Sequence, residues 1–278
     1  MPTLRLGTAV LAPLVMTLLV AVEAQAQSQT ESRARSAAES ASASSPSFDH
    51  TAFDRLLTRH VDQGGLVDYA AFEDEPAFDE YLSRLASADV EALDADARLA
   101  LWINAYNAWT IELINREDRP ESIKDINKTL GFIPTGGAWR VRFAEVAGET
   151  WTLDEIEHEV IRERFDEPRI HFALVCAAIG CPPLRAGAYT GGQLDRQLDE
   201  QARAFLLDSP GKNRVDAESA RVHLSPIFDW YEEDFGDGRE DLGRYLAQWF
   251  EGDEAELLRS GDFRVDYTDY DWSLNIRR

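Results

Sequence analysis

The residues best suited to chemistry lie in the stretch RIHFALVCAAIGCPPLR, at positions 169–185. This stretch holds Cys176 and Cys181, the two cysteines of the 278-residue chain, together with His171, one of five histidines. An apolar run leads to the first cysteine, and Gly180 and two prolines flank the second. Thiols beside an imidazole can form a nucleophilic site, a metal site or a disulfide, so the stretch is the first candidate for a functional site.

The residue types leave four interpretations of the two cysteines open. A disulfide is favoured if the protein is exported, although so short a loop needs a tight turn to bring the α-carbons within about 7 Å. Two buried thiols would instead act as small apolar side chains. A nucleophilic cysteine would need a histidine base and an amide or carboxylate to orient that base. Zinc is the fourth interpretation, but a C-x4-C spacing with scattered histidines lacks the usual paired ligands.

The apolar run IHFALVCAAI predicts a buried strand, at least over its first half. In a strand, His171 and Cys176 point to opposite faces, so they cannot pair directly. Cys181 follows Gly180, where the chain can bend away from the core. We therefore expect Cys181 to be the exposed and reactive thiol and Cys176 to be buried and inert.

The clearest helix is predicted over residues 97–117, ARLALWINAYNAWTIELINRE. Apolar residues recur at helical spacing, and no charged residue lies between Leu99 and Ile111, which indicates a central, buried helix. Asn104 and Asn107 lie together on its flank. Because buried amides must find hydrogen-bond partners, these two residues are either structural clamps or site residues.

Further helices and a few strands complete the expected organisation. Residues 151–165 predict a helix that starts with a capping box, Thr152 with Glu155, and carries Glu157 and His158. The pattern predicts more helices at 191–209, 225–236 and 241–250, and strands at 138–146, 169–177, 220–225 and 262–267. The fold class expected is a helix-rich α+β domain with a small sheet and a buried central helix, with α/β as the alternative. A papain-like or transglutaminase-like similarity is a further possibility.

The N-terminus has the three parts of a secretory signal peptide at residues 1–26, ending in the small residues of AQA. Residues 27–47 are rich in Ser, Ala, Gln and Glu and predict a disordered leader. All seven Trp lie in residues 48–278, which predict a single globular domain. The expected location is periplasmic or secreted, with no membrane span after signal removal.

The formal net charge of −23 is spread along the whole chain, with 51 acidic and 28 basic residues. Phosphate binding needs a stripe of Lys and Arg, so nucleic acid is disfavoured as a partner. A uniformly acidic surface keeps a protein soluble where salt screens its self-repulsion, which suggests a salt-adapted (halophilic) source.

Five ordered blocks of the sequence resemble domain-of-unknown-function family 547. They are ALWINAYNAWTIELI, WTLDEIEHEVIR, RIHFALVCAAIGCPPLR, LSPIFDWYEEDF and YDWSLN, which extend over about residues 48–275. The resemblance implies an exported bacterial member of a family without an established activity. It also marks motif positions without giving them roles, namely Asn104, Asn107, Glu157, His158, His171, Cys176, Cys181 and Asp271.

The function expected from these residues is a thiol-dependent hydrolase or acyl-transfer enzyme that needs no cofactor and no metal. Cys181 is the expected nucleophile, His171 or His158 the base, and Asn107 an orienting group. Substrate contacts are expected from Asn104, Glu157, Cys176 and Asp271. The expected partner is a small molecule or a peptide. The alternative is a non-catalytic binding or structural domain, with either buried structural cysteines or a disulfide.

The dispersed acidic charge generates a test of the salt-adaptation hypothesis. Screening shortens the reach of surface repulsion to about 3 Å at molar salt, so the melting temperature should rise between low and molar salt. Thermal unfolding followed by circular dichroism across a sodium chloride series measures this. A flat or falling curve would contradict the hypothesis.

Overall fold

The computed structural model describes residues 46–127, 129–130, 133–134 and 137–277. The chain divides into two units, residues 1–46 and 47–278, and the second contains the described helices and strands. The predicted signal peptide and nearly all of the predicted leader lie outside the described residues.

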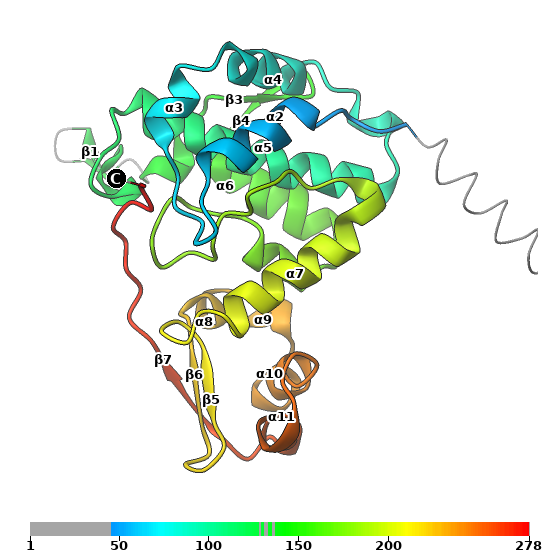
Figure 1. Cartoon of the computed structure of the whole chain (residues 1–278), viewed down its shortest axis with the longest axis vertical. Coiled ribbons are helices and arrows are strands. Elements are labelled where there is room, and N and C mark those ends of the chain that lie inside the picture. The colour runs from blue at the N-terminus through cyan, green and yellow to red at the C-terminus, as the bar shows by residue number, and fades with distance from the viewer. Residues whose placement is uncertain (1–45, 128, 131–132, 135–136, 278) are drawn as a thin grey trace, which may run out of the picture. The chain divides into compact units, whose positions relative to one another are not determined.

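Helix α5 (Ala95–Arg116) is the centre of the second unit (Figure 1). Asp94 caps its N-terminus by accepting a hydrogen bond from the backbone N–H of Ala97. Every residue from Leu99 to Ile111 is buried, because no charged side chain in that stretch requires water. The predicted buried central helix is confirmed.

Three N-terminal helices pack near α5, namely α2 (Thr51–His60), α3 (Tyr69–Glu73) and α4 (Pro76–Ala86). Their apolar faces contribute Phe53, Phe72 and Tyr81 to a first hydrophobic core that α5 shares. Short 3-10 turns η1 (Val90–Ala92) and η2 (Ile123–Asp125) lie before and after α5. These elements build the layer from which the central helix presents its residues.

A hairpin leads into the helix that carries Glu157 and His158. The hairpin consists of antiparallel strands β3 (Ala144–Val146) and β4 (Glu149–Trp151). Before it in the chain come the two-residue strands β1 (Thr129–Leu130) and β2 (Ile133–Pro134), which pair with each other, and the turn η3 (Ala138–Arg140). Helix α6 (Leu153–Glu155) then begins with the predicted capping box and continues as the π-helix η4 (Ile156–Arg162). A π-helix is rare and is frequently found at functional sites.

A second hydrophobic core lies between one face of α7 (Leu194–Leu206) and the C-terminal third of the chain. A three-stranded sheet has the order β5 (Arg214–Asp216), β6 (Arg221–Leu224), β7 (Arg264–Tyr267), with the β6–β7 pair parallel. The helices here are α8 (Ile227–Trp230), α9 (Glu232–Phe235), α10 (Arg239–Leu246) and α11 (Gly252–Ser260). The fold is therefore α+β, as expected. No helix among the described residues has both the length and the apolar character needed to cross a membrane.

The segment with the cysteines is not a strand, so this prediction was wrong. Residues Pro168–Phe172 form the 3-10 helix η5, and the chain continues irregularly to the turn η6 (Gly191–Gln193). Backbone groups that a strand would pair with another strand are bound instead by side chains of α5. Asn107 donates to the carbonyl of Ala173 (2.9 Å) and accepts from the N–H of Val175 (3.0 Å).

The last residues return from β7 to the first core and run past the cysteine loop (Figure 1). The N–H of Gly180 donates to the carbonyl of Asp271 (2.7 Å), and the N–H of Ile179 donates to Ser273 (2.8 Å). Bridges of Ala178 with Leu274 and of Val67 with Ile276 continue the contact. This C-terminal segment therefore forms a wall beside the cysteines.

The two amide clamps generate a prediction about stability. The side-chain amide of Asn104 donates one hydrogen bond to the backbone of Tyr189 and accepts one from it. Asn107 binds the backbone of Ala173 and Val175 in the same way. Asn107→Leu should lower the free energy of unfolding by about 1–3 kcal/mol for each backbone group left unpaired. Urea unfolding measures the loss. Glu117→Gln, at the exposed end of the same helix, should change stability by less than about 0.5 kcal/mol, and equal effects of the two changes would refute the clamp.

Candidate functional site

A cavity of about 340 Å³ lies where the two cores meet. Its walls come from the loop that contains Cys176 and Cys181 (the cysteine loop), the π-helix η4, helix α8 and the C-terminal segment. Five of the eight residues proposed from the sequence line this cavity: Glu157, His158, His171, Cys176 and Cys181. The other lining residues are Tyr106, Trp139, Arg140, Asp154, Leu174, Pro182, Ile227, Trp230, Tyr231, Tyr270 and Trp272.

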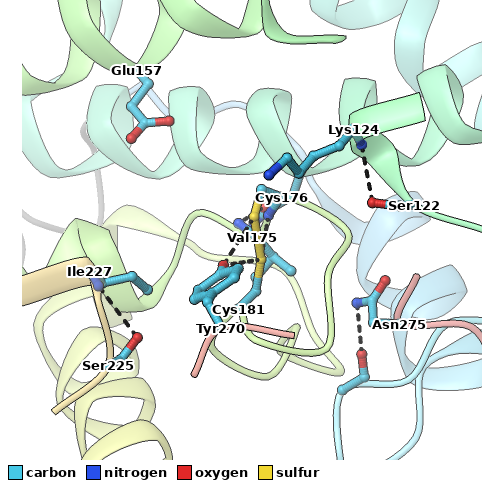
Figure 2. Close-up of a disulfide and its surroundings, with 12 residues drawn as sticks. Ser122, Lys124, Glu157, Val175, Cys176, Cys181, Ser225, Ile227, Tyr270 and Asn275 are labelled. Carbon is cyan, nitrogen blue, oxygen red and sulfur yellow. Dashed lines mark hydrogen bonds between the residues drawn. A yellow bond between two sulfur atoms is a disulfide. The ribbon is translucent and has the colours of Figure 1, made fainter. Parts of the chain in front are cut away.

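The two cysteines form a disulfide, with their α-carbons 6.3 Å apart (Figure 2). Of the four interpretations, the structure therefore selects the first. The tight turn between the cysteines includes Ala177 in the left-handed region, with φ of 59°. Closing a loop this short stabilises the folded state by only about 2 kcal/mol in the chain-entropy model.

The burial of the two cysteines is the reverse of the expected one. Cys181 is only 2% exposed, whereas Cys176 is partly exposed. The expectation failed because the chain does not leave the core after Gly180. Leu184 is buried just beyond the prolines, and the ring of Tyr270 covers the loop from the other side.

Tyr270 places its hydroxyl against both sulfurs of the disulfide, as Figure 2 shows. The hydroxyl oxygen is 3.2 Å from Sγ of Cys181 and 3.3 Å from Sγ of Cys176. Gly180 makes this approach possible, because a β-carbon there would come within 2.7 Å of the tyrosine ring. Burial raises the pKa of Tyr270, and the charge of Glu157 raises it further, so the hydroxyl keeps its proton as a donor.

Lys212 supports the same loop from the second core. Its ammonium group donates to the carbonyl of Cys181 at 2.5 Å. Burial lowers the pKa of Lys212 to about 8, although the charge of Asp271 opposes the shift. The loop is therefore fixed on one side by the C-terminal segment and on the other by this lysine.

Glu157 is the buried acid of the cavity, with 7% exposure. It lies in the π-helix and accepts a hydrogen bond from the hydroxyl of Tyr231 at 2.6 Å. Burial raises the pKa of Tyr106 well above its ordinary value, and the neighbouring Glu157 carboxylate raises it too. The carboxylate is thus surrounded by hydroxyl groups that remain protonated, and it has room for further donors.

His158 lines the cavity but has a partner on each side of its ring. The guanidinium of Arg162 donates to Nδ1 at 2.9 Å, so in the neutral ring the proton lies on Nε2. Nε2 is 3.8 Å from the carboxylate of Asp154, one helical turn earlier. His158 therefore presents a donor rather than a base in this arrangement.

His171 is buried and donates from Nε2 to Oδ2 of Asp234 at 2.6 Å. Arg162 binds the same carboxylate through two bonds, of 2.6 and 2.8 Å. Burial alone would raise the pKa of Asp234, but the hydrogen bonds from His171 and Arg162 hold it well below its ordinary value. Tyr231 stacks on the His171 ring at 4.0 Å between centroids, and both rings line the cavity, so the ion cluster contacts the cavity through His171.

Aromatic rings form the opposite wall. Tyr270 lies 4.9 Å from Trp230 and 4.5 Å from Trp272, measured between ring centroids, and Trp139 meets Trp272 edge-on at 6.0 Å. Trp230 is 46% exposed and therefore reaches solvent from the cavity. A wall of this kind accepts a flat or apolar molecule.

Three residues proposed from the sequence do not line the cavity. Asn104 and Asn107 use both ends of their amides on backbone groups, as the structural interpretation expected. Asp271 is exposed, and its carboxylate accepts from the N–H of Ser273 in a local turn. None of the three is hydrogen-bonded to a candidate histidine or to a sulfur in the described structure.

Several important residues of the site were not proposed from the sequence. Arg162 and Asp234 lie in helices without a recognisable catalytic spacing, and Tyr231, Tyr270 and Trp272 line the cavity as aromatic residues without a catalytic motif. Their signal is three-dimensional, because the chain brings them together over long separations. The described residues contain no group of three or more His, Cys, Asp or Glu side chains arranged to hold a metal ion.

The ion cluster generates a prediction about acid stability. The pKa of Asp234 is depressed in the folded state, so its contribution is full above the unfolded pKa of about 3.9 and disappears as the pH falls through the folded value. Asp234→Asn should therefore lose about 1–3 kcal/mol at pH 7, with a gap from the native protein that narrows below pH 4.

Urea unfolding at pH 7, 5, 4 and 3 measures this gap. The matched control is Glu233→Gln, which removes a carboxylate bonded to the same arginine but 80% exposed, and it should have little effect. A gap that stays constant down to pH 3 would contradict the assigned charge state.

Comparison with known proteins finds a family that part of the chain resembles. The model of a family described as a protein of unknown function, DUF547, matches residues 90–206. No curated protein and no solved structure matches the chain, so the papain-like or transglutaminase-like similarity stays a prediction. The matched residues contain three of the five family-like sequence blocks, together with both cysteines, Glu157 and both candidate histidines. Over residues 90–206, this chain is similar to the DUF547 family.

Proposed function

We propose that this domain binds a small organic molecule in the cavity between its two cores. The observation that carries the proposal is the composition of the cavity, an aromatic wall opposite a buried carboxylate. Ligand sites in proteins are typically concave and apolar, with a few polar groups that orient the ligand. A volume of about 340 Å³ suits a compact molecule rather than a folded partner.

The chemistry of the wall suggests which end of the ligand lies where. The carboxylate of Glu157 accepts one hydrogen bond from the hydroxyl of Tyr231 and retains acceptor sites for another donor. Asp154 adds a second acid at the rim, while Arg140 is the cavity-lining arginine. The ligand is therefore a molecule with an amine or another positively charged donor for Glu157 and a flat body for Trp139, Trp230 and Trp272.

A thiol-dependent hydrolase or acyl-transfer enzyme is the second candidate, confined to the reduced protein. The observation that favours it is that Sγ of Cys181 lies within hydrogen-bonding distance of two donors, which would stabilise a thiolate. His171 and His158 are the candidate bases, but in the described structure their rings bond to Asp234 and Arg162 rather than to sulfur. We further propose that the protein is exported, because disulfides persist in oxidising compartments.

The binding proposal is tested with phenethylamine, compared with neutral phenethyl alcohol and anionic phenylacetate. Binding is followed by tryptophan fluorescence of the oxidised protein, since Trp230 reaches both the cavity and solvent. The amine should bind tightest, and Glu157→Gln should weaken it by roughly tenfold or more, the loss expected when a charged partner is removed.

The matched control is Glu159→Gln, which removes an exposed acid from the same π-helix and should leave affinity unchanged. Equal binding of the three compounds, or an effect of Glu159→Gln as large as that of Glu157→Gln, would overturn the assignment. The second candidate is tested separately by hydrolysis of a p-nitrophenyl ester before and after reduction, and activity of the oxidised protein would contradict it.

A further inference from the structure

The two sulfurs of the disulfide have different surroundings. Sγ of Cys181 is buried and accepts the backbone N–H of Cys176 at 3.1 Å as well as facing the hydroxyl of Tyr270 at 3.2 Å. Cys176 is partly exposed, lines the cavity, and shares only the tyrosine hydroxyl, at 3.3 Å. A hydroxyl has one proton to donate, so Cys181 has a donor that Cys176 lacks.

This asymmetry fixes how the bond would break. In thiol–disulfide exchange a thiolate attacks one sulfur and the other leaves as a thiolate, and the better leaving group is the one whose charge is stabilised. Hydrogen-bond donors stabilise a thiolate, and the peptide N–H and Tyr270 both point to Cys181. Both cysteines line the cavity, but accessibility selects Cys176 as the sulfur attacked, because Cys176 is partly exposed whereas Cys181 is only 2% exposed.

Charges near the disulfide act in both directions. The ammonium group of Lys212, bonded to the carbonyl of Cys181, favours a thiolate there. Glu157 opposes it from across the cavity. The directed hydrogen bonds are therefore the feature that distinguishes one sulfur from the other.

We propose that the Cys176–Cys181 disulfide is redox-active and oxidises a low-molecular-weight dithiol that enters the cavity. The dithiol's thiolate attacks Sγ of Cys176, a mixed disulfide forms, the Cys176–Cys181 bond breaks, and Cys181 leaves as a thiolate. The second thiol of the dithiol then attacks the dithiol's first sulfur, which is bonded to Cys176 in the mixed disulfide, and releases Cys176. Two electrons pass to the protein, the dithiol becomes a cyclic disulfide, and its two protons end on the two cysteines.

This activity goes beyond ligand binding and does not require the proposed amine. The cavity gives it a substrate class, since about 340 Å³ admits a small dithiol but not a folded protein. Tyr270 acts here as a positioning residue, because its hydroxyl stabilises the leaving sulfur without taking part in a bond to the substrate.

The first experiment locates the attacked sulfur. Native oxidised protein is mixed with 2-mercaptoethanol, quenched in acid and mapped by mass spectrometry, and the mixed disulfide should be on Cys176. Cys181→Ser, which leaves Cys176 free, should react with hydroxyethyl disulfide, whereas Cys176→Ser should react at least tenfold more slowly while folded. Mixed disulfide mainly on Cys181, or equal amounts on both, would overturn the proposed direction.

The second experiment measures the contribution of Tyr270. Reduction of the native protein by dithiothreitol should slow by roughly tenfold in Tyr270→Phe, the effect of one hydrogen bond to a charged group. Thiolate absorbance near 240 nm of the reduced protein should also fall at fixed pH, which a loss of packing alone would not produce. Tyr267→Phe, an exposed tyrosine on β7, is the matched control and should change neither reading.

A disulfide that dithiothreitol reduces only in denaturant would show that the bond is structural and overturn the proposal. The amine-binding test uses protein kept oxidised, so either proposal can fail while the other stands. Rate loss in Tyr270→Phe that is matched by Tyr267→Phe would also overturn the role given to the hydroxyl.

Discussion

The buried amides of helix α5 are the constraint on which the site depends. A helix enclosed by apolar side chains has little room for a polar group that lacks a partner, because an unpaired buried amide costs about 1–3 kcal/mol. Asn107 meets this requirement by holding Ala173 and Val175, and Asn104 by holding Tyr189. The segment between these anchors carries both cysteines, so its path is fixed at each end by a side chain of the central helix.

An ion cluster holds the two cores together beside the cavity. Arg162 belongs to the π-helix of the first core, Asp234 to helix α9 of the second, and His171 to a short helix that contributes to both. Partly buried charges of this kind are costly unless all are paired, and here each carboxylate oxygen of Asp234 has a donor. The hydrogen bonds define the distance between the cores and leave a space where neither core packs completely.

The parts of the fold that were predictable are those in which local pattern and tertiary environment agree. Helix α5 has an uninterrupted apolar pattern, and strands β6 and β7 form within the two segments predicted as strands at 220–225 and 262–267. The cysteine segment has the composition of a strand, but none of the strands β1 to β7 pairs with it. Side chains of α5 bind its backbone instead, and no periodicity in the segment itself contains that information. For the same reason, the expectation that this segment bends out of the core after Gly180 was wrong.

The reactive groups of the candidate site could be predicted from the sequence, but the residues that form its walls could not. Cysteine, histidine and acid are rare enough for their types to attract notice, whereas Tyr231 and Trp230 resemble core aromatics in sequence. The residues matched by the family supply the sulfurs and Glu157, while Trp230, Tyr231, Tyr270 and Trp272 all come from beyond position 206. Most of the aromatic wall of the chamber is thus encoded in a different part of the chain from the sulfurs. Substitutions at Trp230, Tyr231 or Trp272 can remodel the chamber while leaving the sulfurs and Tyr270 unchanged, which offers this architecture a route to new ligands.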